Sequence, residues 1–166
     1  MIQRIQTVYL AIVAIFSVSV LFAKIGTYLV GANTVAWFNN FVFNAEGTSV
    51  ESAGPWALGV ILILVFILNV VSIMLFNFRM RQLRLTIFST ILLVGYVATY
   101  AFFAWLYQGK LEAAGVEDVS YHFPFIALLP ILSIIFNILA IHGIRKDEAL
   151  VRSLDRIRSL KMKNEE

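Results

Sequence analysis

Few side chains in this chain have the type and spacing that chemistry needs. The sequence has no cysteine, which excludes disulfides, thiolate metal sites and cysteine nucleophiles. His122 is a lone histidine in its segment, and one histidine without a second ligand nearby is a weak metal signal. The serines and threonines stand in no nucleophile motif with a base. We therefore expect no catalytic residue, no cofactor or metal site, and no enzymatic activity.

Two asparagines interrupt long apolar runs and are candidates for a specific polar contact. Asn69 lies 14 residues after position 55 and Asn137 lies 14 residues after position 123, where their runs begin, so the two share a depth. An unpaired amide in hydrocarbon is costly, and interhelical amide bonds in membranes contribute about 0.6 kcal/mol on average. We expect the pair to join helices rather than bind a substrate. A direct bond between the two amides would make the second and fourth runs neighbours.

The apolar runs themselves, at 6–23, 55–77, 86–107 and 123–143, fill much of the 166 residues. A spanning helix needs about 20 apolar residues. The first run exceeds the roughly 7–15 apolar residues of a signal peptide, so we expect a retained helix. The runs predict an all-α membrane protein, an antiparallel four-helix transmembrane bundle over 1–144 with a tail at 145–166. No ionisable residue lies in the middle of a run, which argues against proton-coupled transport and intramembrane proteolysis.

Lysine and arginine gather on one side of this predicted bundle. Eleven of the 13 basic residues lie at the amino end, between the second and third runs, or in the tail, and only Lys24 and Lys110 lie on the other side. Basic residues stay in the cytoplasm, so both termini should be cytoplasmic. The sequence pI of about 9.3 then reflects topology, and we expect no nucleic-acid partner.

The outer loop at 25–54 has β-branched and aromatic residues on both sides of a turn candidate at 31–33, which predicts a β-hairpin. Its polar second half leads to Pro55, a residue that suits a helix start. The other outer loop is short and acidic, and we expect one helical turn in it. Pro130 falls inside the fourth run and should kink that helix, because proline removes a backbone donor.

The tail has an apolar stripe at helical spacing, with charges opposite. Its contact face is predicted to include Leu150, Leu154 and Ile157. A basic amphipathic helix of this kind suits the anionic inner leaflet, which we favour, or a protein partner.

The opening MIQRIQTVYL and the tail segment IRKDEALVRSLDRIR resemble a family of small four-span inner-membrane proteins of Bacteroidota, catalogued as a domain of unknown function. RKDEALVRS is the most specific element of the resemblance. It implies the inner membrane of a Gram-negative cell and brings no catalytic residues.

Three functions fit these observations to different degrees. The first is a non-catalytic accessory or scaffold subunit of a membrane complex, whose partners are the lipid bilayer and either another membrane protein or further copies of the chain. The alternative is a small oligomeric transporter or channel, which the lack of charge within the runs disfavours. The third is a membrane enzyme acting on lipid, which would need a cluster of Asp, His or Cys near an interface.

Overall fold

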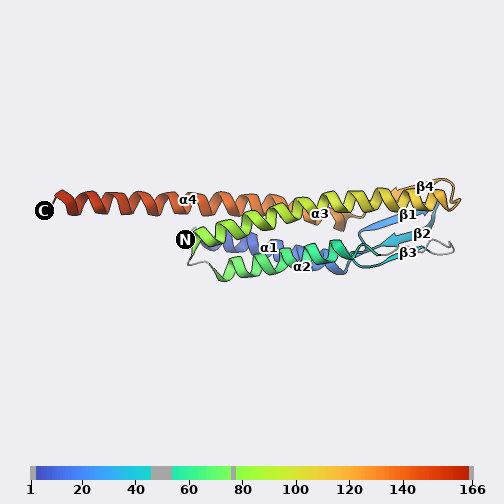
Figure 1. Ribbon diagram of the computed structural model, residues 1–166, viewed down its shortest axis with the longest axis horizontal. Coiled ribbons are helices and arrows are strands. Elements are labelled where there is room, and N and C mark those ends of the chain that lie inside the picture. Colours follow the sequence, from blue (N-terminus) through green and yellow to red (C-terminus); the bar gives the residue numbers. More distant parts are fainter. Residues whose placement is uncertain (1–2, 46–53, 76–77, 165–166) are drawn as a thin grey trace.

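The computed structural model describes residues 3–45, 54–75 and 78–164, which form four helices and a small sheet (Figure 1). The helices are α1 (Gln3–Phe22), α2 (Trp56–Met74), α3 (Arg79–Ala113) and α4 (Leu129–Asn164). Each is long and apolar enough to cross a membrane. The four helices predicted from the apolar runs are therefore present.

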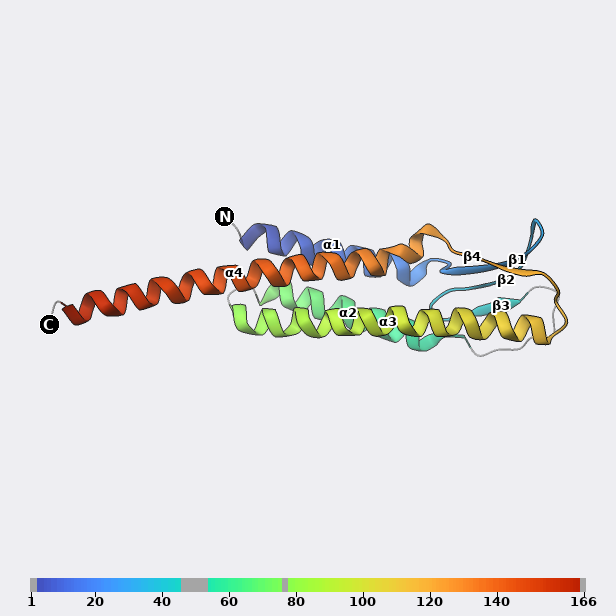
Figure 2. The ribbon, with the colours of Figure 1, turned by 90° about the horizontal axis from the view of Figure 1, so that it is seen from above.

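Successive helices run in opposite directions and close into a four-membered bundle (Figures 1 and 2). Helix α1 packs against α2 and α4, and α3 packs against the same two helices. The second and fourth helices are thus diagonal to each other, with α1 and α3 between them.

Helix α3 shows why these helices pack as they do. Its buried residues recur along one face at steps of three, four or seven, and they are Gln82, Thr86, Ser89, Leu93, Tyr96, Tyr100, Tyr107 and Leu111. This is the spacing of a helix that packs along a continuous seam. Its exposed residues include Phe88, Ile91 and Phe102. Polar side chains are therefore among the buried residues of α3 while large apolar ones are exposed, unlike a helix at a soluble protein's surface.

The sheet lies at one end of the bundle. Its strands are β1 (Gly26–Val30), β2 (Asn33–Phe38), β3 (Phe43–Ala45) and β4 (Val119–His122), all antiparallel in the order β3-β2-β1-β4. The predicted hairpin is present as β1 and β2. Its turn needs Gly31, whose φ of 60° is strained for residues with a Cβ.

The second outer loop differs from the single helical turn that we expected. Helix α3 continues to Ala113, and Val119–His122 form a strand that pairs with β1. Thr27 lies opposite His122 and Tyr28 opposite Tyr121. Alternate residues of β4 are exposed, so the strand has only a short apolar face, and its partner lies about 90 positions earlier in the chain.

The prediction that Pro130 kinks the fourth helix is also wrong, because Pro130 lies at the start of that helix. A 3-10 helix, η1 (Phe125–Leu128), precedes α4, and Pro130 is the second residue of α4. In the first turn of a helix the missing N–H of proline has no intrahelical partner to lose, so it starts the helix rather than bending it.

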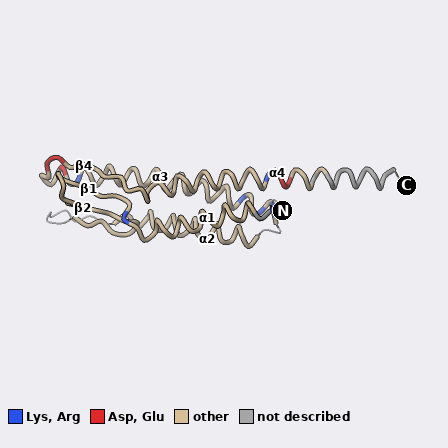
Figure 3. The backbone as a smooth tube through the Cα atoms, turned by 180° about the vertical axis from the view of Figure 1, so that it is seen from behind, with Lys and Arg blue, Asp and Glu red and all other residues tan. Residues whose placement is uncertain are grey.

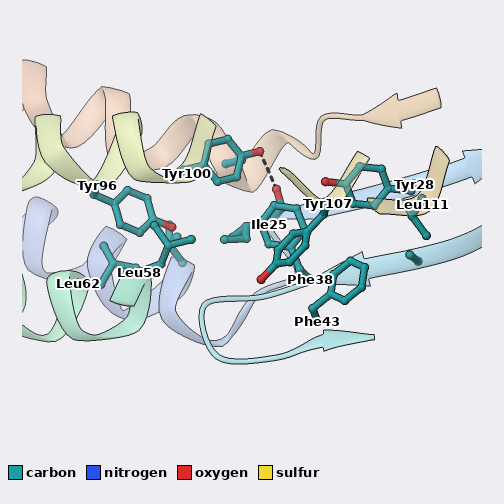
Figure 4. Packing of buried hydrophobic residues seen from close by; sticks show 13 residues of the cluster. Ile25, Tyr28, Phe38, Phe43, Leu58, Leu62, Tyr96, Tyr100, Tyr107 and Leu111 are labelled. Carbon is teal, nitrogen blue, oxygen red and sulfur yellow. Dashed lines mark hydrogen bonds between the residues drawn. The ribbon is translucent and has the colours of Figure 1, made fainter. Parts of the chain in front are cut away.

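An aromatic core joins the sheet to the adjoining end of the bundle (Figure 4). Tyr28 and Phe38 point from the sheet toward α3, and the ring of Phe43 stacks on Tyr107 with 4.2 Å between centroids. The Tyr28 hydroxyl donates a hydrogen bond to the main-chain oxygen of Ala104 at 2.7 Å. The sheet is therefore a packed part of the bundle rather than a free hairpin.

Candidate functional sites

The two asparagines meet at a third residue, Ser89 of α3. The Nδ2 atom of Asn69 lies 2.8 Å from the Ser89 hydroxyl oxygen, and the Nδ2 atom of Asn137 lies 3.2 Å from the same oxygen. All three side chains have no exposed surface. Helices α2 and α4 are therefore connected through α3, rather than by a direct bond between their amides.

The carbonyl oxygens of these two amides have no hydrogen-bond partner within the described part of the chain. Asn69 also donates to the main-chain oxygen of Val65 at 2.8 Å, which fixes the orientation of its amide. The cluster is polar and uncharged, with no group that titrates. It can tie three helices together, but it has no acid or base that would activate the Ser89 hydroxyl as a nucleophile.

A second polar contact lies at the end of the bundle where the chain begins. Gln6 of α1 donates from Nε2 to Oδ2 of Asp147 at 2.9 Å, and both side chains are buried. Arg79, the first residue of α3, donates to the main-chain oxygen of Asp147 at 3.0 Å. We call Gln6, Arg79 and Asp147 the Asp147 junction.

The spacing of apolar residues gives no sign of this junction, because its partners are 141 positions apart. Gln6 and Asp147 do lie in the two segments that carry the family resemblance, which is the only signal that could have directed attention to them. The structure brings those two segments into contact.

Beyond the Asp147 junction, α4 continues past the ends of the other helices (Figures 1 and 2). We call residues 148–164 the α4 extension. Its 17 residues correspond to about 25 Å of helix at 1.5 Å per residue. Leu150 and Val151 are 50% and 41% exposed. The side chains of Leu154 and Ile157, the other predicted contact residues, lie outside the described part.

Charges divide between the two ends of the bundle (Figure 3). The described basic residues near the Asp147 junction are Arg79, Arg81, Arg84, Arg145 and Lys146, against the acidic Asp147 and Glu148. The opposite end has Lys24 and Lys110, together with the acidic residues Glu112, Glu117 and Asp118. The two ends therefore differ in sign, with the described apolar surface between them.

At the sheet end, Asn40 joins three helices. Its Nδ2 atom donates to the main-chain oxygen of Val20 at 2.7 Å, near the last turn of α1, and its Oδ1 atom accepts from the Tyr96 hydroxyl at 2.9 Å. The N–H of Gly59 in α2 donates to the Asn40 main-chain oxygen at 3.3 Å. Asn40 has no exposed surface, so its role is to satisfy buried groups at this end of the bundle.

Three tyrosines near the sheet are hydrogen-bond donors rather than bases. The hydroxyls of Tyr100 and Tyr121 contact each other, and Tyr100 donates to the main-chain oxygen of Ile25 at 2.8 Å (Figure 4). Burial raises the pKa of Tyr121. Burial, with the neighbouring Tyr121 and Tyr107, also raises the pKa of Tyr28. Phenols of this kind stay neutral at physiological pH.

A cavity of about 160 Å³ lies between α3 and the start of α4, lined by Tyr96, Val97, Tyr100, Ala101, Phe123, Ala127, Pro130 and Ile131. Its walls carry no charged group. Among the described residues no group of three His, Cys, Asp or Glu side chains could hold a metal ion, and His122 is exposed on β4. Neither the cavity nor the histidine has the chemistry of a catalytic centre.

These features define a four-helix protein of the kind that can cross a membrane several times, with polar contacts that connect helices. A family model described as a domain of unknown function, DUF4293, matches residues 2–157. The chain therefore belongs to this family. A comparison with curated proteins finds no match.

Proposed function

We propose that this chain is an integral protein of the bacterial inner membrane with both termini in the cytoplasm. Four helices of sufficient length and the apolar outer surface of α3 support insertion in lipid. The 11-to-2 division of basic residues between the two sides supports the orientation. Under this proposal the Asp147 junction is at the cytoplasmic face and the sheet is at the periplasmic face.

Within that membrane the chain serves as a non-catalytic accessory or scaffold subunit. The observation that carries this proposal is the α4 extension, a helix that continues for 17 residues after the bundle ends. Leu150 and Val151 stay about half exposed there, although burying such a side chain contributes about 1.5–3 kcal/mol. A partner protein that covers this stripe would supply that burial. The proposal needs neither a cofactor nor nucleic acid.

The rival function, a small oligomeric transporter or channel, is less well supported. Val13, Val65 and Leu93 pack together with no exposed surface, between the Ser89 cluster and the Asn40 contacts. This apolar layer separates the polar contacts of Ser89 from those of Asn40 in the described interior of the bundle. A channel would therefore have to form between subunits.

Site-specific photo-crosslinking in living cells tests the scaffold role. A photoreactive residue at Leu150 should yield one discrete heavier product whose partner also co-purifies at fixed stoichiometry. Ile63, 40% exposed on α2, is the matched control, because it should face lipid and yield no such product. A product from Leu150 that contains only this chain would favour a homo-oligomer, and no product at Leu150 or Val151 would contradict the scaffold proposal.

A further inference from the structure

We infer that the Asp147 junction fixes the direction of the α4 extension, so that this helix projects away from the cytoplasmic membrane surface instead of lying on it. The inference rests on the proposed membrane orientation and scaffold role. It assigns a positioning function to Gln6, Arg79 and Asp147, and it decides between the two locations that the sequence leaves open for the tail.

The first observation concerns where α4 could bend. Between Ile144 and Asn164 the chain contains no glycine or proline, and sharp helix kinks almost always need such residues, a π-bulge or an inserted group. The nearest glycine is Gly143. A bend that laid the basic extension on the membrane would therefore be easiest at this residue.

Gln6 occupies the space beside Gly143. A Cβ atom placed on Gly143 would lie 2.9 Å from Cγ of Gln6, so α1 and α4 are in close contact there. One helical turn later, the same Gln6 side chain holds the carboxylate of Asp147. A bend at Gly143 would have to break this buried hydrogen bond, and it would leave a buried carboxylate without that donor.

Arg79 restrains the same turn of α4 from another helix. Its guanidinium donates to the main-chain oxygen of Asp147 at 3.0 Å. Ile144, with no exposed surface, completes the packing in this turn. Helix α4 is thus held by α1 and α3 together at its last packed turn.

The Asp147 junction acts against an electrostatic attraction between the α4 extension and anionic lipid. The α4 extension has five basic residues, Arg152, Arg156, Arg158, Lys161 and Lys163, against two acidic ones, Glu148 and Asp155. Each basic residue near an anionic leaflet contributes about 1 kcal/mol of attraction. Without the junction the extension should bend toward the headgroups. With it, the helix stays available to a partner some distance from the surface.

Spin labelling tests the direction, because the cysteine-free chain accepts a single labelled cysteine. Ser159→Cys carries a nitroxide in nanodiscs of phosphatidylcholine, alone or mixed with an equal part of phosphatidylglycerol. The readout is the collision rate of the nitroxide with a nickel chelate attached to lipid headgroups. The native chain should show a low rate in both compositions. The Gln6→Ala/Arg79→Ala variant, which removes both donors to Asp147, should show a severalfold higher rate in the anionic nanodiscs.

Two controls separate positioning from general damage. Asp147→Asn keeps an oxygen that can accept from Gln6 and should behave as the native chain does. Gln108→Ala removes an exposed glutamine–carboxylate bond to Glu112 within α3, at the opposite end of the bundle, and should have no effect. A high rate in the native chain, or no change in the double variant, would overturn the inference. Since no partner takes part, a failed crosslinking experiment leaves this result independent of the scaffold proposal.

Discussion

Asn40 is a single buried residue whose hydrogen bonds connect three helices. Its side chain satisfies the end of α1 and the hydroxyl of Tyr96, and its main chain accepts from α2. Removing a buried partner costs about 1–3 kcal/mol for each group left unsatisfied. Asn40→Leu should therefore lower the free energy of unfolding by about 2–5 kcal/mol. Reversible unfolding in mixed micelles measures it.

The matched control for that change is Asn44→Leu on β3, where the side chain is exposed. Asn44→Leu should leave the unfolding midpoint nearly unchanged. Equal effects of the two substitutions would show that Asn40 has no special role at the sheet end of the bundle.

Ser89 matters because two amides depend on it. Ser89→Ala removes the hydrogen bond that the Nδ2 atom of Asn137 makes within the described part of the chain. It also removes the bond from Asn69 to Ser89 and leaves the one from Asn69 to Val65. We expect a loss of about 1–2 kcal/mol, and less for Asn69→Leu or Asn137→Leu alone. A double-mutant cycle in mixed micelles measures the coupling.

In that cycle, adding Asn137→Leu to Ser89→Ala should not lower the free energy of unfolding further. It should recover part of the loss, because the amide left without its partner has been removed. Strictly additive effects would show that Ser89 and Asn137 are energetically independent, in conflict with the observed hydrogen bond.

At the scale of elements, hydropathy predicts the helices but not their full lengths. Helix α3 begins at Arg79, before the apolar run at 86–107, because Arg, Gln and Leu continue a helix well although they do not extend a hydrophobic segment. Helix α4 likewise continues through the charged tail. Hydropathy reports where lipid contact is favourable, whereas backbone hydrogen bonding continues beyond that point.

Contacts between distant elements were the part that the sequence could not supply. The turn at Gly31 predicts the hairpin because both strands are local, but β4 has four residues and a partner far along the chain. In the same way Asn69 and Asn137 were noticeable as amides within apolar runs. Ser89 and Gln6 do not stand out in the sequence, since their roles depend on which helices become neighbours.

The pairing of β4 with the hairpin can be tested with introduced cysteines. Thr27 and His122 are opposite each other in the register, so Thr27→Cys/His122→Cys should form an intramolecular disulfide under mild oxidation. Counting free thiols before and after reduction measures how much of the disulfide has formed. The pair Thr34→Cys/His122→Cys, which is not in register, should stay reduced, and equal oxidation of both pairs would indicate a mobile strand rather than a fixed sheet.

On the scale of the whole molecule, polarity is arranged radially and along the bundle axis. Polar side chains such as Gln82, Thr86 and Ser89 lie inside the bundle beside its apolar core, and large apolar side chains also cover its outside. Charges lie mainly at the two ends, with basic residues dominant at one of them (Figure 3). A bilayer as surrounding medium accounts for both arrangements, because hydrocarbon favours the apolar surface and the cytoplasmic side favours the basic end.

That account gives a definite topology to test. Asn33 in the hairpin and Ser153 in the α4 extension are both exposed, and the chain has no native cysteine. A membrane-impermeant thiol reagent should label Asn33→Cys in intact spheroplasts and Ser153→Cys only after lysis, because the proposed topology places the side with 11 basic residues in the cytoplasm. Total labelling after denaturation is the control for expression. Labelling of Ser153→Cys in intact spheroplasts would reverse the orientation and place the Asp147 junction on the periplasmic side.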